Sequence, residues 1–286
     1  MKRFVSALVL TLLVMGFAGT ALSQSPTLEK IKSSGVFTIG VRNNAPPFSF
    51  INSKKERTGF SNELAAIVHK AVQKKAGKPI KVEMKETTPA TRIPLLTSNA
   101  VDLIAETMTD TRARRESVDF SLTFFVTGAD FLVKRKGPIK DLKDIAGRRI
   151  GVLGGATNER LLKEKHPQAQ LVTFPNQAAA FTALEEGKLD AFCNDEVQLY
   201  GLKYKSKSPR DWELLGAEWL SYEPYGMAMR KNDSDFRAVV NNALMEAIEG
   251  GEYFNLYEKW FGSRSETPIR MSRSFKAFLE YQVIPK

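Results

Sequence analysis

Apolar and polar positions recur along the chain with two periods, and the changes of period predict a regular succession of strands and helices. Residues 61–76 carry apolar side chains at helical spacing, and residues 80–85 alternate apolar and charged side chains as a strand does. Further strands are expected at 36–41 and 102–106, with a short helix at 92–98. This alternation predicts a parallel sheet covered by helices.

The same succession begins again near Gly147 and predicts a second unit of similar build. Strands are expected at 149–153, 170–174 and 189–194, and helices at 157–165 and 177–186. The end of the chain, 233–261, is also expected to be helical and to return to the first unit.

The expected fold class is therefore α/β, with two lobes. The first lobe would comprise residues 24–129 and 227–286, and the second would comprise residues 130–226. Extended stretches at 129–135 and 226–231 would carry the chain between the lobes. Ligands of open α/β sheets bind outside the carboxyl ends of the strands, so two such sheets predict a cleft that closes by hinge motion.

The first residues have the pattern of a secretory signal. Lys2 and Arg3 precede an apolar run at 4–17, and the small residues at 21–23 suit a signal peptidase. The run is shorter than the roughly 20 apolar residues of a membrane span, although an uncleaved anchor is the alternative. We expect residues 1–23 to be removed and the mature protein to lie in the periplasm.

The charge balance does not point to a nucleic acid. The chain has 42 basic and 32 acidic residues, and removal of Lys2 and Arg3 leaves 40 against 32, a net charge of +8. Basic side chains are dispersed among acidic ones without an aromatic-studded stripe, so no nucleic-acid partner is expected. Cys193 is the only cysteine, which excludes an internal disulfide and leaves burial to stabilise the fold.

Residue types that carry catalysis are sparse and scattered. His69 lies in a predicted helix and His166 lies near the end of another, and neither has a cysteine or acidic neighbour at ligand spacing. Cys193 lies in an apolar strand, where a thiol is most often a small core residue. The chain has no serine-hydrolase, zinc-protease or phosphate-loop motif. We therefore expect no catalytic residues, no cofactor and no metal site.

A set of short motifs carries the most specific signal. The motifs are NAPPFSF at 44–50, RIPLL at 92–96, DLIAETMTDTRARRESVDFS at 102–121, LDAFCNDEV at 189–197 and YGMAMRK at 225–231. In this order and spacing they resemble family 3, the polar-amino-acid family of periplasmic solute-binding proteins, and within it the glutamate/aspartate-binding members. The resemblance implies a type II periplasmic-binding-protein fold, in which two crossing strands join two α/β lobes. It also implies a monomer that delivers an amino acid to the membrane permease of an ABC importer.

The resemblance further implies roles for five residues. Thr107, Thr109 and Arg114 occupy the stretch that receives the ligand α-carboxylate in this family, and an arginine can hold a carboxylate by two parallel hydrogen bonds. Thr157 matches the second-lobe residue that closes on the same carboxylate, and Asp195 matches the acid that pairs with the α-ammonium group. The alternatives are a solvated helix face for Arg114 and helix caps for Thr157 and Asp195.

Two more arginines suggest the ligand. Arg42 and Arg92 fall where the glutamate/aspartate-binding members place basic residues, and a second carboxylate in a desolvated cleft needs a cation. Glu106 argues the other way, because it repels an acidic ligand unless it turns away or pairs with an arginine. Ala45 also replaces an aromatic lid. Glutamine, asparagine or another small carboxylate therefore stay open, as does a cyclohexadienyl dehydratase-like enzyme on the same scaffold.

Overall fold

The computed structural model describes residues 26–216 and 218–285, so the predicted signal peptide lies outside the described residues. The elements up to the first crossing strand are α1 (Thr27–Ser34), β1 (Val36–Val41), β2 (Asn44–Ala45), β3 (Ser49–Ile51), β4 (Arg57–Thr58), α2 (Phe60–Ala76), β5 (Lys81–Glu86), α3 (Arg92–Thr97), β6 (Leu103–Ile104) and α4 (Arg112–Arg115). Nearly all of the expected strands and helices in this part are present, with ends shifted by one or two residues.

The remaining elements also follow the periodicity closely. They are β7 (Val118–Lys134), β8 (Arg149–Leu153), α5 (Thr157–Lys165), β9 (Gln170–Phe174), α6 (Gln177–Glu185), β10 (Ala191–Asp195), α7 (Glu196–Lys205), β11 (Trp212–Leu214), β12 (Tyr222–Arg230), α8 (Ser234–Glu249), α9 (Glu252–Phe261) and α10 (Arg273–Tyr281). Short 3-10 helices lie at Leu142–Ile145 and Pro209–Asp211. No helix of the described part of the chain is both long and apolar enough to cross a membrane.

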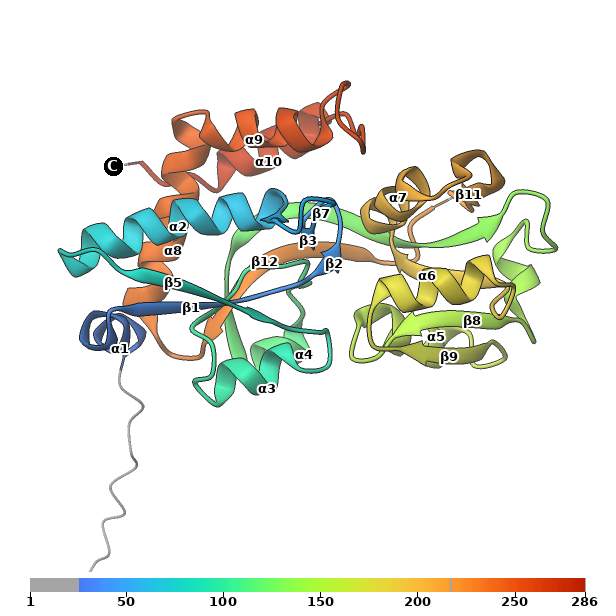
Figure 1. Ribbon diagram of the computed structural model, residues 1–286, viewed down its shortest axis with the longest axis horizontal. Helices are drawn as coiled ribbons and strands as arrows, with labels where there is room; N and C mark the ends of the chain where they lie inside the picture. Colours follow the sequence, from blue (N-terminus) through green and yellow to red (C-terminus); the bar gives the residue numbers. More distant parts are fainter. Residues whose placement is uncertain (1–25, 217, 286) are drawn as a thin grey trace, which may run out of the picture.

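The strands run in the order β5-β1-β6-β12-β7-β10-β8-β9, with β11 beside β7. In the first lobe β1 is parallel to β5 and β6, and in the second lobe β8 is parallel to β9 and β10. The strands β7 and β12 run antiparallel to their neighbours. The expected α/β fold of two lobes is confirmed, and Figure 1 shows helices packed around the sheet in both bodies.

Two strands lie side by side between the two bodies in Figure 1. Residues 118–128 of β7 pair with β12, and residues 129–133 pair with β10 in the other body. The crossing strands are therefore longer than the stretches expected at 129–135 and 226–231. The reason is that most of β7 is buried on both faces, so its sequence has no alternation that marks where a strand begins.

Glycines explain two differences from the expected helices. The helix expected to begin at Ser61 begins at Phe60, because Gly59 precedes it with φ 128° and lies against Phe48. The single helix expected over 233–261 is two helices, because Gly250 and Gly251 interrupt it and Gly251 has φ 80°. Glycine adopts positive φ without the steric cost that a Cβ imposes.

The two lobes have separate cores. In the first lobe α2, α8 and α9 pack on the sheet around an aromatic cluster formed by Phe48, Phe60, Phe125, Tyr257 and Phe261. The second lobe is built around two apolar clusters that flank β8 and β10, and the thiol of Cys193 is buried in one of them. The helices after β12 thus pack against the core of the first lobe.

Candidate ligand-binding cleft

The expected site residues lie at the carboxyl ends of parallel strands in both lobes. Arg42 directly follows β1, and Thr107 follows β6 in the first lobe. In the second lobe Thr157 begins α5 after β8, and Asp195 ends β10. This edge is where open α/β sheets bind ligands.

The lobes touch each other across this edge. The Arg114 guanidinium donates from Nη2 to the Gly155 carbonyl at 3.2 Å. A Cβ at Gly155 would lie 2.9 Å from the Ala90 Cα, and a Cβ at Gly201 would lie 2.5 Å from the Pro46 carbonyl oxygen. Only glycine leaves room for these approaches, so the lobes are in a closed arrangement.

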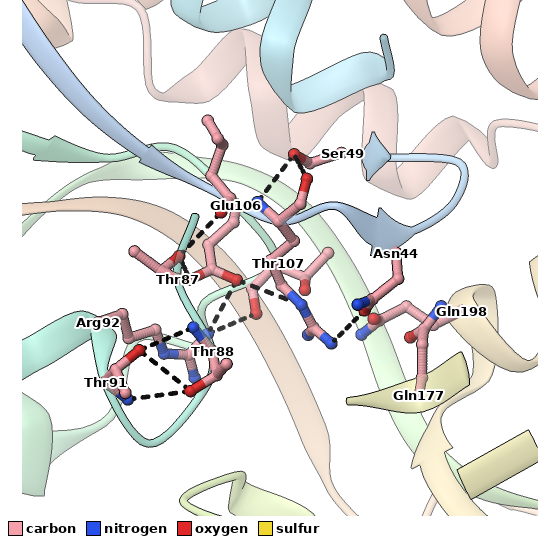
Figure 2. Close-up of polar contacts among 12 residues, drawn as sticks. Asn44, Ser49, Thr87, Thr88, Thr91, Arg92, Glu106, Thr107, Gln177 and Gln198 are labelled. Atoms are coloured by element: carbon pink, nitrogen blue, oxygen red, sulfur yellow. Dashed lines mark hydrogen bonds and ion pairs between the residues drawn. The ribbon is translucent and has the colours of Figure 1, made fainter. Parts of the chain in front are cut away.

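A buried group of charges forms the first-lobe wall of the cleft. Glu106 is fully buried, and its Oε2 lies 3.7 Å from both Arg42 Nε and Arg92 Nη1. Its other oxygen accepts a hydrogen bond of 2.9 Å from the Thr87 hydroxyl, and Figure 2 shows Glu106 beside Thr87 and Arg92. Glu106 thus pairs with two arginines and does not turn away. Burial lowers the pKa of Arg42, and Glu106 opposes that shift.

Buried polar atoms without hydrogen-bond partners lie on both sides of the cleft. The buried atoms are Arg92 Nε, Glu106 Oε2, Thr107 Oγ1, Asn158 Oδ1, Gln177 Nε2 and Gln198 Oε1. Figure 2 shows that Arg92, Glu106, Thr107, Gln177 and Gln198 lie in one region of the cleft. Buried polar groups are normally hydrogen-bonded, so these donors and acceptors mark a surface suited to a polar ligand.

Asp195 is the central acid of the second lobe. Its carboxylate accepts hydrogen bonds from Asn158 Nδ2 at 2.9 Å, from Gln198 Nε2 at 3.2 Å and from the Tyr225 hydroxyl. It precedes α7 but makes no side-chain cap, so the helix-cap interpretation is wrong. Burial, and then the charge of Glu223, raise its pKa to about 6. The hydrogen bond from Tyr225 opposes this shift.

Arg114 is turned inward from α4, unlike its exposed neighbours Arg112 and Arg115. Its Nη1 donates to the Thr109 carbonyl at 2.8 Å, whereas Arg115 pairs with Asp110 at the surface. Burial, and then Arg92, lower the pKa of Arg114 to about 9, so it stays protonated at neutral pH. The solvated-face interpretation of Arg114 is therefore wrong.

Thr109 and Thr157 share a partner that sequence reasoning missed. Both hydroxyls donate to Oε2 of Glu223, at 2.6 and 2.8 Å, and Glu223 is only 2% exposed. Thr157 therefore binds Glu223 and does not cap α5, which has no side-chain cap. The signal for Glu223 was its place two residues before Tyr225, since alternate residues of a strand share one face.

The expected site residues are therefore brought into one charged cluster. Arg42 interacts electrostatically with Glu106, Arg92 and Asp195, and Arg114 interacts with Arg92, Glu106 and Asp195. Thr107 belongs to the same cluster, since its carbonyl accepts from Arg92 Nη1 at 3.0 Å. A cavity of about 420 Å³ adjoins the cluster and is lined by Arg114, Gly155 and Thr157 among others.

No group of three or more His, Cys, Asp or Glu side chains within 26–216 and 218–285 is arranged to hold a metal ion. What the cleft offers is a pair of cationic sites and buried carboxylates, which suit a small zwitterion with a polar side chain.

Comparison with known families identifies the family to which the chain belongs. Residues 37–263 match the family of bacterial extracellular solute-binding proteins, family 3, and the chain belongs to this family. It is thus a solute-binding protein with the type II fold, and the resemblance deduced from the motifs is confirmed.

Individual relatives show how varied the ligands of the family are. The chain is 36% identical to an L-glutamate/L-aspartate-binding protein of Pseudomonas aeruginosa, over 82% of this chain and 80% of that protein. It is 34% identical to an ABC transporter glutamine-binding protein of Bacillus subtilis, over 83% and 85% of the two chains.

Solved structures extend the comparison. A variant arginine-binding protein of T. maritima superimposes with a TM-score of 0.76 at 28% identity, over 83% of this chain and all of that one. An ancestral amino acid-binding protein, described as a precursor of cyclohexadienyl dehydratase, superimposes with a TM-score of 0.71 at 32% identity, again over 83% and 100%. The fold is therefore shared by binding proteins and by the lineage of an enzyme.

Proposed function

We propose that this protein is the periplasmic substrate-binding component of an ABC amino-acid importer and that it binds glutamate or aspartate between its lobes. The observation that carries the proposal is the buried pair Arg42 and Arg92, which faces a single carboxylate, Glu106. Two positive charges and one negative charge leave a net charge of +1 in a desolvated wall. A ligand side-chain carboxylate neutralises this charge.

The remaining residues bind the amino-acid backbone. Arg114 holds the α-carboxylate, since a guanidinium has five donors and only some of them are used by the Thr109 and Gly155 carbonyls. Asp195 accepts from the α-ammonium group, and Thr107 contributes a hydroxyl that has no partner within the protein. These assignments agree with the names of the glutamate/aspartate-binding relatives.

Lobe closure follows from the same assignment. The mature chain, released from its signal peptide, is a monomer. Its first lobe comprises residues 24–129 and 227–286, and its second lobe comprises residues 130–226. The hinge lies where β7 and β12 cross between these lobes. Residues from both lobes contact one ligand, so the ligand stabilises the closed arrangement. The closed form then docks on the membrane permease.

A second candidate is an amide ligand, glutamine or asparagine. Glu106 Oε2 is buried and has no hydrogen-bond donor, and Arg92 Nε has no acceptor. A carboxamide satisfies both, because its NH₂ group donates to Glu106 and its oxygen accepts from Arg92. A glutamine-binding relative of Bacillus subtilis accords with this alternative.

Calorimetric titration of ligand-free protein with L-glutamate, L-aspartate, L-glutamine and L-asparagine separates the candidates. We expect the acids to bind more tightly. Arg92→Ala should weaken their binding by about tenfold to a hundredfold, because a hydrogen bond to a charged group contributes roughly 1.5–3 kcal/mol. Arg112→Ala, which removes an exposed arginine of α4, is the matched control and should leave affinity unchanged.

Three outcomes contradict the acidic-ligand proposal. Tighter binding of the amides, abolished by Glu106→Gln, supports the second candidate instead. Formation of phenylpyruvate from prephenate shows a dehydratase. Absence of binding to all of the amino acids tested removes the ligand assignment while leaving the fold.

A further inference from the structure

Glu223 lies on β12 and is among the most buried carboxylates of the molecule. It is 2% exposed, and no ion pair of the described residues includes it. Three hydroxyl groups stabilise it, since Ser221 donates to Oε1 at 2.5 Å while Thr109 and Thr157 donate to Oε2. A buried carboxylate is costly unless it is hydrogen-bonded, so the three hydroxyl groups offset the cost of burying Glu223.

The two hydroxyls that share Oε2 come from opposite lobes. Thr109 follows β6 in the first lobe and forms an isolated β-bridge with Tyr225 of β12. Thr157 is the first residue of α5 in the second lobe. When the lobes separate, one of the two hydrogen bonds must break, whichever lobe β12 accompanies.

The hydroxyl groups of Thr109 and Thr157 cannot donate a second hydrogen bond. A threonine hydroxyl has one O–H donor, and in both residues it is directed at Glu223. A ligand carboxylate that took these hydrogens would leave the buried Glu223 carboxylate without two of its three donors. Because such a loss is unfavourable, the ligand α-carboxylate is left to Arg114, and the threonines keep Glu223.

We propose that Glu223 is a positioning residue that joins Thr109 and Thr157 across the cleft and thereby stabilises the closed arrangement before any ligand binds. This inference rests on the hinge closure of the proposed function but not on the identity of the ligand. The carboxylate replaces contacts that the ligand would otherwise have to supply between the lobes. It therefore raises ligand affinity through the fraction of closed protein.

The closed fraction can be measured without ligand. Spin labels at Lys75→Cys on α2 and Lys165→Cys on α5 report the distance between the lobes, because both positions are exposed and Cys193 is fully buried. We expect the ligand-free protein to populate a short distance. Glu223→Gln should shift the closed-to-open ratio by roughly tenfold toward the open form, as loss of a charge-assisted hydrogen bond predicts.

Thr109→Val and Thr157→Val each remove one of the two hydroxyl groups with little change of shape. Because Glu223 moves with one of the lobes, one of these variants should shift the distances as Glu223→Gln does. Its combination with Glu223→Gln should be no more open than either single variant, because both remove the same bond. Ser221→Ala is the matched control. It removes a hydrogen bond to Glu223 that does not link the two lobes, so the closed fraction should stay near that of the parent protein.

Four results would overturn the inference. The first is a ligand-free protein with no short-distance population. The second is an unchanged distance distribution in Glu223→Gln, and the third is full additivity of Glu223→Gln with both threonine variants. Tighter ligand binding by Glu223→Gln is the fourth, because it would show that Glu223 competes with the ligand. If none of the amino acids tested binds, the distance measurements still decide the role of Glu223.

Discussion

At the scale of single residues, burial changes the chemistry of the acid at the centre of the cleft. Asp195 has a pKa of about 6, well above its ordinary value of 3.8, because it is buried beside Glu223. Protonation therefore favours the folded state between these two values, and stability gained from this group rises as the pH falls through 6. Ligand binding should respond in the opposite direction, since an ammonium group needs the ionised acid.

The affinity for the amino acid is therefore expected to fall below pH 6. At pH 5 about one tenth of Asp195 is ionised, which raises the apparent Kd by roughly tenfold relative to pH 7. Calorimetric titrations at both pH values measure this change. Asp195→Asn should bind weakly and without this pH dependence.

Asp130 gives the matched control for this measurement. Burial raises its pKa to about 6 as well, but its carboxylate accepts from the backbone N–H groups of Phe131 and Gly216. Asp130→Asn should keep the pH dependence of ligand affinity. A ligand affinity that does not change with pH in Asp130→Asn would show that Asp130, and not Asp195, causes the pH dependence.

At the scale of elements, α7 contacts the first-lobe hairpin, formed by β2 and β3, at Gly201. Glycine is a poor residue for the middle of a helix, costing roughly 1 kcal/mol relative to alanine. Its place in α7 is explained by the lobe contact, since a Cβ there would lie 2.5 Å from the Pro46 carbonyl oxygen. The helix thus gives up intrinsic stability for a close approach of the lobes.

Gly201→Ala should consequently separate closure from folding. We expect weaker ligand binding, because the added methyl group prevents full closure. The free energy of unfolding of the ligand-free protein should change by no more than about 1 kcal/mol, because the higher helix propensity of alanine opposes the loss of the closed ligand-free form. Calorimetry and urea denaturation measure the two quantities, with Lys203→Ala in the same helix as control. Unchanged affinity would show that α7 and the hairpin do not limit closure.

At the scale of the whole molecule, the last helix, α10, packs against the core of the first lobe. The family match ends at residue 263, yet α10 packs on the first lobe beyond it, as Figure 1 shows. Leu279 is fully buried, and Phe275 lies against Phe125 with ring centroids 5.7 Å apart. Gln282 hydrogen-bonds both backbone groups of Thr123 on the edge of β7.

Leu279→Ala should lower the free energy of unfolding by about 2–4 kcal/mol, the range for buried leucines, while ligand affinity stays unchanged. Tyr281→Ala, which alters a side chain that is 89% exposed, should change stability by less than about 0.5 kcal/mol. Urea denaturation and calorimetry compare the variants. A loss of affinity in Leu279→Ala would mean that α10 is coupled to the cleft.

Much of the fold was predictable because its signals are local. The strands at 149–153 and 170–174 and the helix at 157–165 match the structure, since periodicity and short turns define them. The extent of β7 was not predictable, because a strand buried on both faces resembles any apolar run. The break between α8 and α9 had a visible signal, the pair Gly250 and Gly251.

The candidate site was predictable only in part. The motifs predicted Arg42, Arg92, Arg114 and Asp195 as site residues, and the structure brings these four side chains into one charged cluster. They did not identify Glu223, which is remote from Thr109 and Thr157 in sequence and meets them only when the lobes close. Hydrogen-bond partners of this kind depend on the packing of separate elements.

The sequence by itself determined the class of protein and the alternation of strands and helices, and it predicted which residue types are expected at a ligand site. These properties follow from local periodicity and from an ordered set of motifs. Only the tertiary structure decided that Glu106 pairs with two arginines, that Asp195 is buried beside Glu223 and that Gly155 and Gly201 let the lobes approach closely. Burial and contact between distant segments arise from folding, and they set the charge state and the hydrogen bonds of each group.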